Sequence, residues 1–331
     1  MEYRRLGKSG LQLSTLSFGT WVTFGKQIDD KVADSLLSTA YDAGVNFFDN
    51  AEIYAAGKSE TVMGNILKKK TWCRSSYCVS SKVFFGYEDK LPNQTGLSRK
   101  HVIEGCHAAL KRLQVDYLDL FFCHRPDKNT PIEETVLAMN NLIQQGKILY
   151  WGTSEWPADT IMQAHSIAKE NHLIGPTMEQ PQYNMFHRER FELEYRRLYT
   201  EIGLGTTIWS PLASGVLTNK YANGVPEGAR VNQPELQWLR DFMNSEEGKN
   251  RVEKTKVLAK LADDLGTSVS KLALAWCLKN NNVSTVILGA TKNTQLVENL
   301  DALNVVPLLT EEIMTKIEGI LGNKPKFPLY G

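Results

Sequence analysis

The sequence predicts a closed (β/α)8 TIM barrel of the α/β class. Apolar runs of strand length alternate with amphipathic stretches of helical length along nearly the whole chain, and eight strand runs can be counted. Strands that alternate with helices of this length are parallel, because each helix returns the chain to the same edge of the sheet. Eight such units in 331 residues favour a closed barrel, although periodicity by itself also permits an open, doubly wound sheet.

The predicted strands follow a short opening hairpin that turns between Gly7 and Gly10. Each strand is an apolar run that ends in polar or glycine-rich residues, as expected where a buried strand gives way to a loop. The eight runs are residues 16–21, 45–49, 78–82, 117–124, 148–153, 177–180, 206–210 and 285–289.

The helices are predicted from apolar residues that recur every three or four positions. They are residues 30–43, 59–69, 98–113, 132–145, 158–171, 188–202, 251–265 and 268–280. Three inserts interrupt the alternation, namely the loop 84–97, the irregular stretch 213–248 and the tail after Pro307. Long loops without regular structure are usually lids or binding loops, so each insert is expected to cover one mouth of the barrel.

Composition bounds the class of protein. No linker rich in Pro, Gly or Ser and no low-complexity tract divides the chain, so residues 1–331 are expected to form a single domain. The 38 basic and 37 acidic residues give a net charge of +1, which offers no electrostatic reason to expect nucleic acid or an anionic membrane as a partner. We therefore expect a small-molecule partner.

The cysteines and the amino terminus indicate a cytoplasmic location. The five cysteines are odd in number, scattered and never spaced as CxxC, which is typical of reduced thiols. The amino terminus lacks an apolar core of signal-peptide length, and no segment reaches the ~18 apolar residues of a transmembrane helix. Direct insertion into a membrane is not expected.

Two common nucleotide-binding motifs are absent. GKS occurs at residues 7–9 and 57–59, but a P-loop needs Gly five positions before its GK, where the chain has Glu2 and Glu52. The nearest match to GxGxxG, residues 203–208, precedes a strand, whereas the dinucleotide fingerprint must follow one. Neither a P-loop nor a Rossmann site is expected.

Four ionisable side chains follow consecutive predicted strands: Asp49, Tyr54, Lys82 and His124. In a barrel the carboxyl ends of the strands converge on one mouth, so these side chains are expected to meet. A tyrosine has a reference pKa of about 10, and the Lys82 ammonium is expected to lower it by favouring the phenolate. Asp49 would hold Lys82 charged, and a neutral His124 would donate to the same carbonyl oxygen that Tyr54 protonates.

Each of these residues also has a structural interpretation. Asp49 can cap a helix, Tyr54 can be a core aromatic, Lys82 a surface cation and His124 a satisfied imidazole. For a single residue these are the more common cases, but four such placements at the ends of three consecutive strands favour a catalytic site. No metal is expected, because the six histidines are dispersed and neither HxH nor HExxH occurs.

Further motifs accompany the catalytic set and carry a resemblance to a known family. They are FDNAEIY (48–54), SSKVF (80–84), CHRPD (123–127), WGTSEW (151–156), EQPQYN (179–184), WSPLASGVLTNKY (209–221) and GATKNTQLVEN (289–299). As a set they resemble the aldo-keto reductases over about residues 3–326. The resemblance is closest to the branch that contains the potassium-channel β subunits and their channel-free plant and microbial relatives.

This resemblance implies a (β/α)8 barrel with a long loop that covers the cofactor, and NADPH-dependent reduction of aldehydes or ketones. It implies that Tyr54 is the acid, that Lys82 and Asp49 tune it, and that His124 orients the carbonyl. The implied contacts to the nicotinamide half are Thr20, Trp21, Gln27 and Asp49, with Ser154 and Gln180 on the carboxamide. The implied pyrophosphate contacts are Trp209, Ser210, Pro211, Leu212, Ser214, Lys220 and Arg230, and the implied adenine contacts are Gly289, Thr291, Gln295, Glu298 and Asn299.

The cations Lys220, Arg230 and Lys292 favour NADPH over NADH, because a 2′-phosphate needs positive charge. Residues 289–299 also have an ordinary interpretation as strand, turn and capped helix, and residues 209–221 as a loop punctuated by Pro and Gly. A helix amino terminus beside cations favours the phosphate interpretation of residues 289–299.

Three positions depart from the family pattern. The channel β subunits carry Asn in place of His124 and Arg in place of Glu155, and many relatives carry Trp in place of Phe85. His124 favours an enzyme whose main function is turnover, whereas Glu155 leaves one cofactor contact open. The side chains expected to line an apolar pocket for aryl or medium-chain aldehydes are Trp21, Phe84, Phe85 and Trp156, of which Phe84 and Trp156 fit ordinary barrel-end packing nearly as well.

The alternative function is a cofactor-binding regulatory β-type subunit of a potassium channel. The chain begins almost at its first predicted strand, so no pore-blocking extension is expected, and together with His124 this favours the enzyme. A barrel enzyme of unrelated chemistry is a third hypothesis. Close relatives form tetramers, so the resemblance also implies a homotetramer.

Overall fold

The computed structural model describes residues 1–331 except 22, 88–89, 228, 234–235 and 328–331. Its residues group into two compact units. The first comprises Met1–Pro181, Glu194–Ile208 and Asn282–Val297, and the second comprises Gln182–Leu193, Trp209–Asn281 and Glu298–Gly331. The single domain expected from the sequence stays a prediction.

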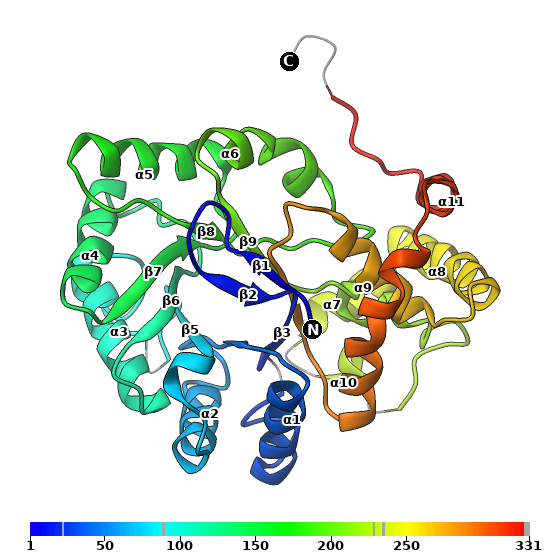
Figure 1. Ribbon diagram of the computed structural model, residues 1–331, viewed down its shortest axis with the longest axis horizontal. Helices are drawn as coiled ribbons and strands as arrows, with labels where there is room; N and C mark the ends of the chain where they lie inside the picture. Colours follow the sequence, from blue (N-terminus) through cyan, green and yellow to red (C-terminus); the bar gives the residue numbers. More distant parts are fainter. Residues whose placement is uncertain (22, 88–89, 228, 234–235, 328–331) are drawn as a thin grey trace. The chain divides into compact units, whose positions relative to one another are not determined.

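The first unit contains a closed barrel of eight parallel strands in the order β10-β3-β4-β5-β6-β7-β8-β9 (Figure 1). The strands are β3 (Leu16–Gly19), β4 (Phe47–Asp49), β5 (Cys78–Val83), β6 (Leu118–Cys123), β7 (Ile148–Thr153), β8 (Met178–Glu179), β9 (Gly205–Ile208) and β10 (Thr285–Leu288). The ring closes where β10 pairs with β3 on one side and with β9 on the other. The (β/α)8 prediction is therefore confirmed, and the open doubly wound sheet is excluded.

The opening hairpin fills the amino-terminal mouth of the barrel. It consists of β1 (Tyr3–Arg5) and β2 (Gln12–Ser14), which pair antiparallel. Leu6 and Leu13 are completely buried in one hydrophobic cluster with Phe47, Cys78 and Met178, which are the first residues of β4, β5 and β8. Because the hairpin packs on the amino ends of the strands, the carboxyl ends form the opposite mouth.

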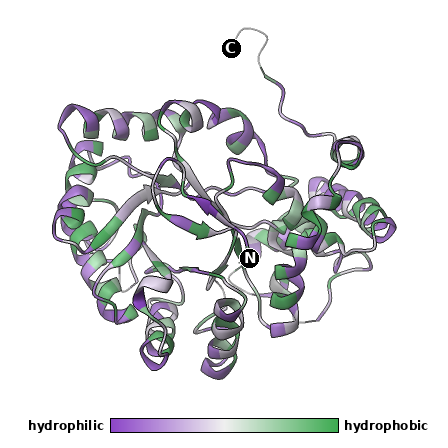
Figure 2. Cartoon of the chain, in the orientation of Figure 1, coloured by the Kyte–Doolittle hydropathy of each residue, from purple (hydrophilic) through white to green (hydrophobic). Residues whose placement is uncertain are grey.

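Helices surround the barrel strands in the first unit (Figure 1). They are α1 (Asp30–Asp42), α2 (Lys58–Lys69), α3 (Arg99–Leu113), α4 (Ile132–Gln144), α5 (Ala158–Glu170) and α6 (Arg196–Glu201), with the 3-10 turn η1 (Arg74–Ser76). Capping side chains fix several starts: Asp29 accepts a hydrogen bond from the Val32 amide at 2.8 Å, and Ser98 from the His101 amide at 3.3 Å. Hydrophobic and hydrophilic residues alternate around these helices, as amphipathic packing requires (Figure 2).

The second unit is mostly helical. It contains η3 (Ala213–Thr218), η4 (Arg230–Asn232), α7 (Gln237–Asn244), α8 (Glu246–Asp264), α9 (Val269–Lys279), η6 (Asp301–Asn304), η7 (Val306–Leu308) and α11 (Glu311–Leu321), while α10 (Asn293–Leu300) begins in the first unit. Two predictions were wrong here, because α7 lies in the stretch predicted to be irregular and α11 lies in the predicted tail. Ser245 accepts a hydrogen bond from the Gly248 amide at 3.1 Å, which starts α8 at Glu246 rather than at 251.

The predicted helix 188–202 is divided. A π turn, η2 (Arg190–Glu194), precedes α6, and Tyr195 stands between them. Tyr195 is completely buried, and its hydroxyl donates to the carbonyl oxygen of Trp156 at 2.6 Å. A π turn holds one residue more than an α turn, which changes the face on which the following residue lies.

The helices and the cysteines also bear on the expectations from the sequence. Among the helices of the described residues, none is long and apolar enough to cross a membrane. All five cysteines are free; Cys73 is exposed and the other four are buried. The cytoplasmic location stays a prediction.

Candidate active site

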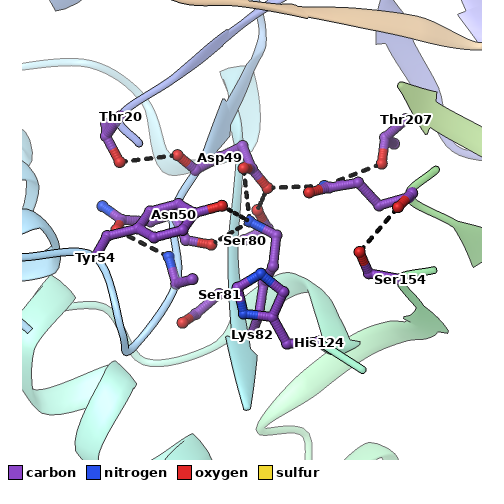
Figure 3. A network of polar contacts seen from close by, with 12 residues as sticks. Thr20, Asp49, Asn50, Tyr54, Ser80, Ser81, Lys82, His124, Ser154 and Thr207 are labelled. Carbon is purple, nitrogen blue, oxygen red and sulfur yellow. Dashed lines mark hydrogen bonds and ion pairs between the residues drawn. The ribbon is translucent and has the colours of Figure 1, made fainter. Parts of the chain in front are cut away.

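Three neighbouring strands bring four ionisable side chains together at their carboxyl ends. Asp49 is the last residue of β4, Lys82 is the penultimate residue of β5, and His124 directly follows β6. Tyr54 lies in the turns between β4 and α2. Figure 3 shows the four side chains around one region, as expected from parallel strand ends in a barrel.

Lys82 is at the centre of this set. It is completely buried, and its Nζ donates to Asp49 Oδ2 at 2.7 Å, to the Asn50 carbonyl oxygen at 2.7 Å and to the Tyr54 hydroxyl oxygen at 3.0 Å (Figure 3). An ammonium group has three N–H donors and no acceptor. All three donors are therefore used, and the hydroxyl oxygen of Tyr54 is the acceptor in its contact with Lys82. The phenolic proton of Tyr54 is left to point elsewhere.

A second set of hydrogen bonds fixes the Asp49 carboxylate. Asp49 Oδ1 accepts from Ser80 Oγ at 2.8 Å and from Gln180 Nε2 at 3.1 Å, and Gln180 Nε2 also donates to Thr207 Oγ1 at 3.2 Å. Asp49 is only 3% exposed, so its charge is balanced by Lys82 rather than by water. Side chains from several strands thus hold the carboxylate against the ammonium.

The backbone that follows Tyr54 is strained. Ala55 and Ala56 have φ values of 50° and 53°, and Gly57 has a φ of 80°. The left-handed region costs a residue with a Cβ about 1–2 kcal/mol. Strain of this kind persists where the surrounding structure enforces it, and it is typical of functional sites.

Burial sets the proton affinities of the tyrosine and the lysine. The pKa of Tyr54 is raised well above its usual value, chiefly by burial and also by the charge of Asp49. The expectation that this pKa is lowered was wrong, because burial disfavours the charged phenolate. Burial also lowers the pKa of Lys82, against the opposing attraction of Asp49. The phenol therefore keeps its proton at neutral pH, which is the state a proton donor needs.

His124 lies beside Tyr54 and Phe85. Its ring centroid is 5.9 Å from that of Tyr54 and 5.1 Å from that of Phe85, both in edge-on contact. Burial, followed by the charges of Lys82 and Arg125, holds the pKa of His124 well below its usual range, so the imidazole is neutral. Its Nδ1 is buried without a hydrogen-bond partner among the described residues, which is uncommon for a native polar atom.

A comparison with protein families agrees with this geometry. A model described as the aldo/keto reductase family matches residues 15–321. The chain belongs to the aldo/keto reductase family. The match extends from the residue before β3 to the end of α11, so it includes the whole barrel. Membership identifies the chain as an oxidoreductase that acts on carbonyl compounds, while its branch within the family stays a prediction.

Aldo/keto reductases typically use a nicotinamide cofactor, and Ser154 and Gln180 fit its carboxamide chemically. The Gln180 side chain donates both of its N–H groups to Asp49 and Thr207, so its amide oxygen remains as an acceptor. Ser154 Oγ donates to the Gln180 carbonyl oxygen at 2.8 Å and accepts from Arg125 Nη1 at 3.3 Å, which leaves the hydroxyl oxygen one further position to accept. Ser154 and Gln180, which are joined by this hydrogen bond, thus each offer an acceptor that suits the NH₂ of a carboxamide.

The other residues predicted at the nicotinamide half differ in exposure. Thr20 is completely buried, and its hydroxyl donates to the Asp49 carbonyl oxygen at 3.1 Å and accepts from Ser59 Oγ at 2.8 Å. Trp21 is 36% exposed, and Gln27 is exposed in a turn. Glu155 has a φ of 59°, and its amide donates to the buried Glu179 carboxylate at 2.5 Å.

The residues predicted at the adenine end are divided between the two units. In the first unit, Gly289 follows β10, and the Thr291 amide and hydroxyl donate to Gln295 Oε1 at 3.0 and 3.1 Å. In the second unit, Glu298 Oε1 accepts from Ser268 Oγ at 2.8 Å, and Asn299 is buried. The adenine contacts stay a prediction.

The residues predicted on the pyrophosphate form a strained loop in the second unit. They are Trp209, Ser210, Pro211, Leu212, Ser214, Lys220 and Arg230, and the side chain of Arg230 lies outside the described part of the structure. Ser210 and Ser214 have φ values of 55° and 56°, and the Ser214 amide donates to Ser210 Oγ at 3.1 Å. Lys220 Nζ lies 5.0 Å from the ring centroid of Tyr221. Because two of its serines are held in the left-handed region, this segment is a stronger candidate for a binding loop than its Pro and Gly content alone indicated.

The predicted pocket residues separate into two groups. Phe84 and Phe85 are half-buried, with ring centroids 5.0 Å apart in edge-on contact, and Phe85 is the one that touches His124. Trp156 is 2% exposed, as a core side chain would be. The aromatic wall next to the catalytic set is therefore formed by Phe85 and Phe84.

Sequence reasoning missed Glu52. Its Oε1 accepts from the backbone amides of Phe84 and Gly86, both at 2.8 Å, and its Oε2 lies 3.7 Å from His101 Nε2. This completely enclosed carboxylate anchors the segment that carries the aromatic wall. The signal in the sequence was an acidic residue placed between Ala51 and Ile53, two positions before Tyr54.

Proposed function

We propose that this aldo/keto reductase reduces aldehydes and ketones to alcohols with NADPH, and that Tyr54 is the general acid. The observation that carries the proposal is the series of contacts from Asp49 through Lys82 to Tyr54, at 2.7 and 3.0 Å. Because Lys82 occupies an acceptor position of the Tyr54 oxygen, the phenolic proton is available to a carbonyl oxygen.

Each side chain has a distinct task in this proposal. Tyr54 transfers its proton to the carbonyl oxygen, and Lys82 stabilises the phenolate that forms. Asp49 keeps the buried Lys82 charged, and the neutral His124 donates a hydrogen bond to the same oxygen. Positioned acid catalysis of this kind contributes ~10²–10⁴ in rate.

NADPH, when bound, supplies the hydride that reduces the carbonyl carbon. The acceptor oxygens of Ser154 and Gln180 support binding of the nicotinamide carboxamide. Lys220, Arg230 and Lys292 are the cations proposed for the 2′-phosphate, which is why NADPH is favoured over NADH. The aromatic wall of Phe84 and Phe85 supports aryl or medium-chain aldehydes as substrates.

The test replaces only the proton donor. Loss of reduced-nicotinamide absorbance is followed with a panel of aldehydes for the unmodified protein and for Tyr54→Phe. We expect kcat to fall by ~10²–10⁴ while the dissociation constant of NADPH stays within a factor of about two. Tyr3→Phe is the matched control, because Tyr3 is 49% exposed on the hairpin at the opposite mouth.

Equal turnover by Tyr54→Phe and the unmodified protein would remove Tyr54 from the role of acid. Tight binding of NADPH by an unmodified protein that reduces none of the aldehydes would instead favour the regulatory β-type subunit. A pull-down against cytoplasmic domains of potassium channels then tests that alternative directly.

A further inference from the structure

The guanidinium of Arg125 has no task in the mechanism above, although it directly follows His124. Arg125 is half-buried, and its Nη1 donates to the His124 carbonyl oxygen at 2.5 Å and to Ser154 Oγ at 3.3 Å. Its Nε and Nη2 have no hydrogen-bond partner among the residues that the structure describes. These two nitrogens form one edge of the planar group, and that edge is unused.

Arg125 also differs from three other partly or completely buried cations of the first unit in its charge balance. Lys82 pairs with Asp49 at 2.7 Å, Arg112 with Glu60 at 2.6 Å and Arg74 with Asp119 at 2.6 Å. Within the described residues, no carboxylate lies within 4.0 Å of Arg125. A partly enclosed guanidinium that has no counter-ion among the described residues favours an anionic ligand, and its geometry suits a carboxylate held by two parallel hydrogen bonds.

The position of Arg125 relates this free edge to the catalytic set. Its Cζ lies 5.7 Å from the ring centroid of Phe85, and that ring is 5.1 Å from the ring of His124. The charge of Arg125 is close enough to lower the pKa of His124, Tyr54 and Lys82. A molecule whose carbonyl contacts Tyr54 and His124 therefore has an aromatic ring and then a cation along one side.

We propose that Arg125 binds an anionic group of the substrate, so that the preferred substrates are aldehydes or ketones that also carry a carboxylate. The Nε and Nη2 edge donates to the two carboxylate oxygens, while Nη1 stays on the His124 carbonyl oxygen and Ser154. Phe85 packs against the apolar part between the carboxylate and the carbonyl. This inference rests on the carbonyl reduction proposed above and specifies its substrate class.

The experiment compares two aldehydes of similar size that differ in charge, para-carboxybenzaldehyde and para-tolualdehyde, at saturating NADPH. Loss of a charge-assisted, bidentate contact lowers affinity by about 10- to 100-fold. We expect Arg125→Met to reduce the kcat/KM ratio of the charged to the neutral aldehyde by that factor, mainly through KM. Arg125→Lys, which keeps the charge but not the planar edge, retains part of the ratio.

Arg197→Met is the matched control. Arg197 is an exposed residue of α6 that pairs with Glu201, and its replacement changes the net charge by the same amount. If the effect of Arg125 is local, the kcat/KM ratio of the charged to the neutral aldehyde stays unchanged in Arg197→Met. An equal loss in both variants means that overall charge steers the substrate, and it overturns the proposal.

Two further outcomes contradict the proposal. Equal loss of activity toward both aldehydes in Arg125→Met means that Arg125 acts only through Ser154 or the His124 carbonyl oxygen. A matching loss of NADPH affinity means that the anion is a cofactor phosphate.

A binding measurement separates this proposal from the proposed function. Calorimetric titration with para-carboxybenzyl alcohol, in the presence of reduced cofactor, measures binding in a complex that cannot transfer hydride. If the unmodified protein reduces neither aldehyde, the reductase function fails. In that case the anion site is still supported if Arg125→Met weakens binding of the alcohol by about tenfold or more. It is contradicted if Arg125→Met and the unmodified protein bind the alcohol equally.

Discussion

Replacing Asp49 with asparagine removes the negative charge beside a completely buried ammonium. Asp49 accepts three hydrogen bonds, from Lys82, Ser80 and Gln180. The amide oxygen of the introduced asparagine can keep the two neutral donors, Ser80 and Gln180, but its NH₂ group then faces Lys82, which also only donates. The change therefore isolates the contact with the ammonium.

The expected loss of stability follows from the burial of the pair. Lys82 is 0% and Asp49 is 3% exposed, so water screens neither charge. Removing one partner of a buried ion pair costs about 3–5 kcal/mol, whereas removing both is often close to neutral. We expect Asp49→Asn to lower the free energy of unfolding by about 3–5 kcal/mol, and Asp49→Asn with Lys82→Met to lower it by less.

Urea unfolding at neutral pH measures all four proteins of this double-mutant cycle. A coupling free energy above about 2 kcal/mol is expected for a contact of this kind. A loss below about 1 kcal/mol for Asp49→Asn, with the two single changes adding up in the double variant, would contradict a buried charged pair. The same variant is also expected to lose turnover, because an uncompensated buried lysine gives up its charge and no longer stabilises a phenolate.

Two other predictions concern the neighbours of this pair. Burial lowers the pKa of His124 in the folded protein. Below the ordinary histidine pKa of about 6.5, the unfolded chain therefore binds a proton that the folded protein does not. The free energy of unfolding then falls as the pH falls, by up to about 1.4 kcal/mol per pH unit. Unfolding of His124→Asn measured between mildly acidic and neutral pH should show a shallower fall, and an unchanged slope would mean that His124 is protonated in the folded state. Glu52→Ala should raise KM for aryl aldehydes more than it lowers kcat, because it leaves the amides of Phe84 and Gly86 without an acceptor, at about 1–3 kcal/mol each. Glu52→Gln keeps the acceptor and should recover most of the affinity; if it behaves like Glu52→Ala in the same kinetic assay, the hydrogen bonds are not what positions the wall.

The fold could be predicted because its signal is local and repeated. Every barrel strand overlaps one of the eight predicted runs. In a barrel the carboxyl ends of all strands meet at one mouth, so the meeting of Asp49, Lys82 and His124 follows from their positions in the sequence. The helices α7 and α11 were missed because they follow long irregular stretches without an intervening strand.

The energetics of the site could not be predicted in the same way. The direction of the Tyr54 pKa depends on how completely the fold excludes water, and a sequence shows only that an ammonium is near. Glu52 bonds to backbone amides about thirty positions away, and any residue type supplies such amides. Arg125 was visible in the sequence, but its unused edge became apparent only once the surrounding carboxylates were placed.

The hairpin at the start of the chain has a consequence for the order of events during turnover. Because Leu6 and Leu13 pack on the amino ends of the strands, a ligand has to approach the catalytic set from the opposite mouth, where the strands end. Two ligands that share one entrance cannot pass each other. Whichever seats deeper must therefore arrive first and depart last, and the hairpin thereby favours a compulsory sequence of association and release.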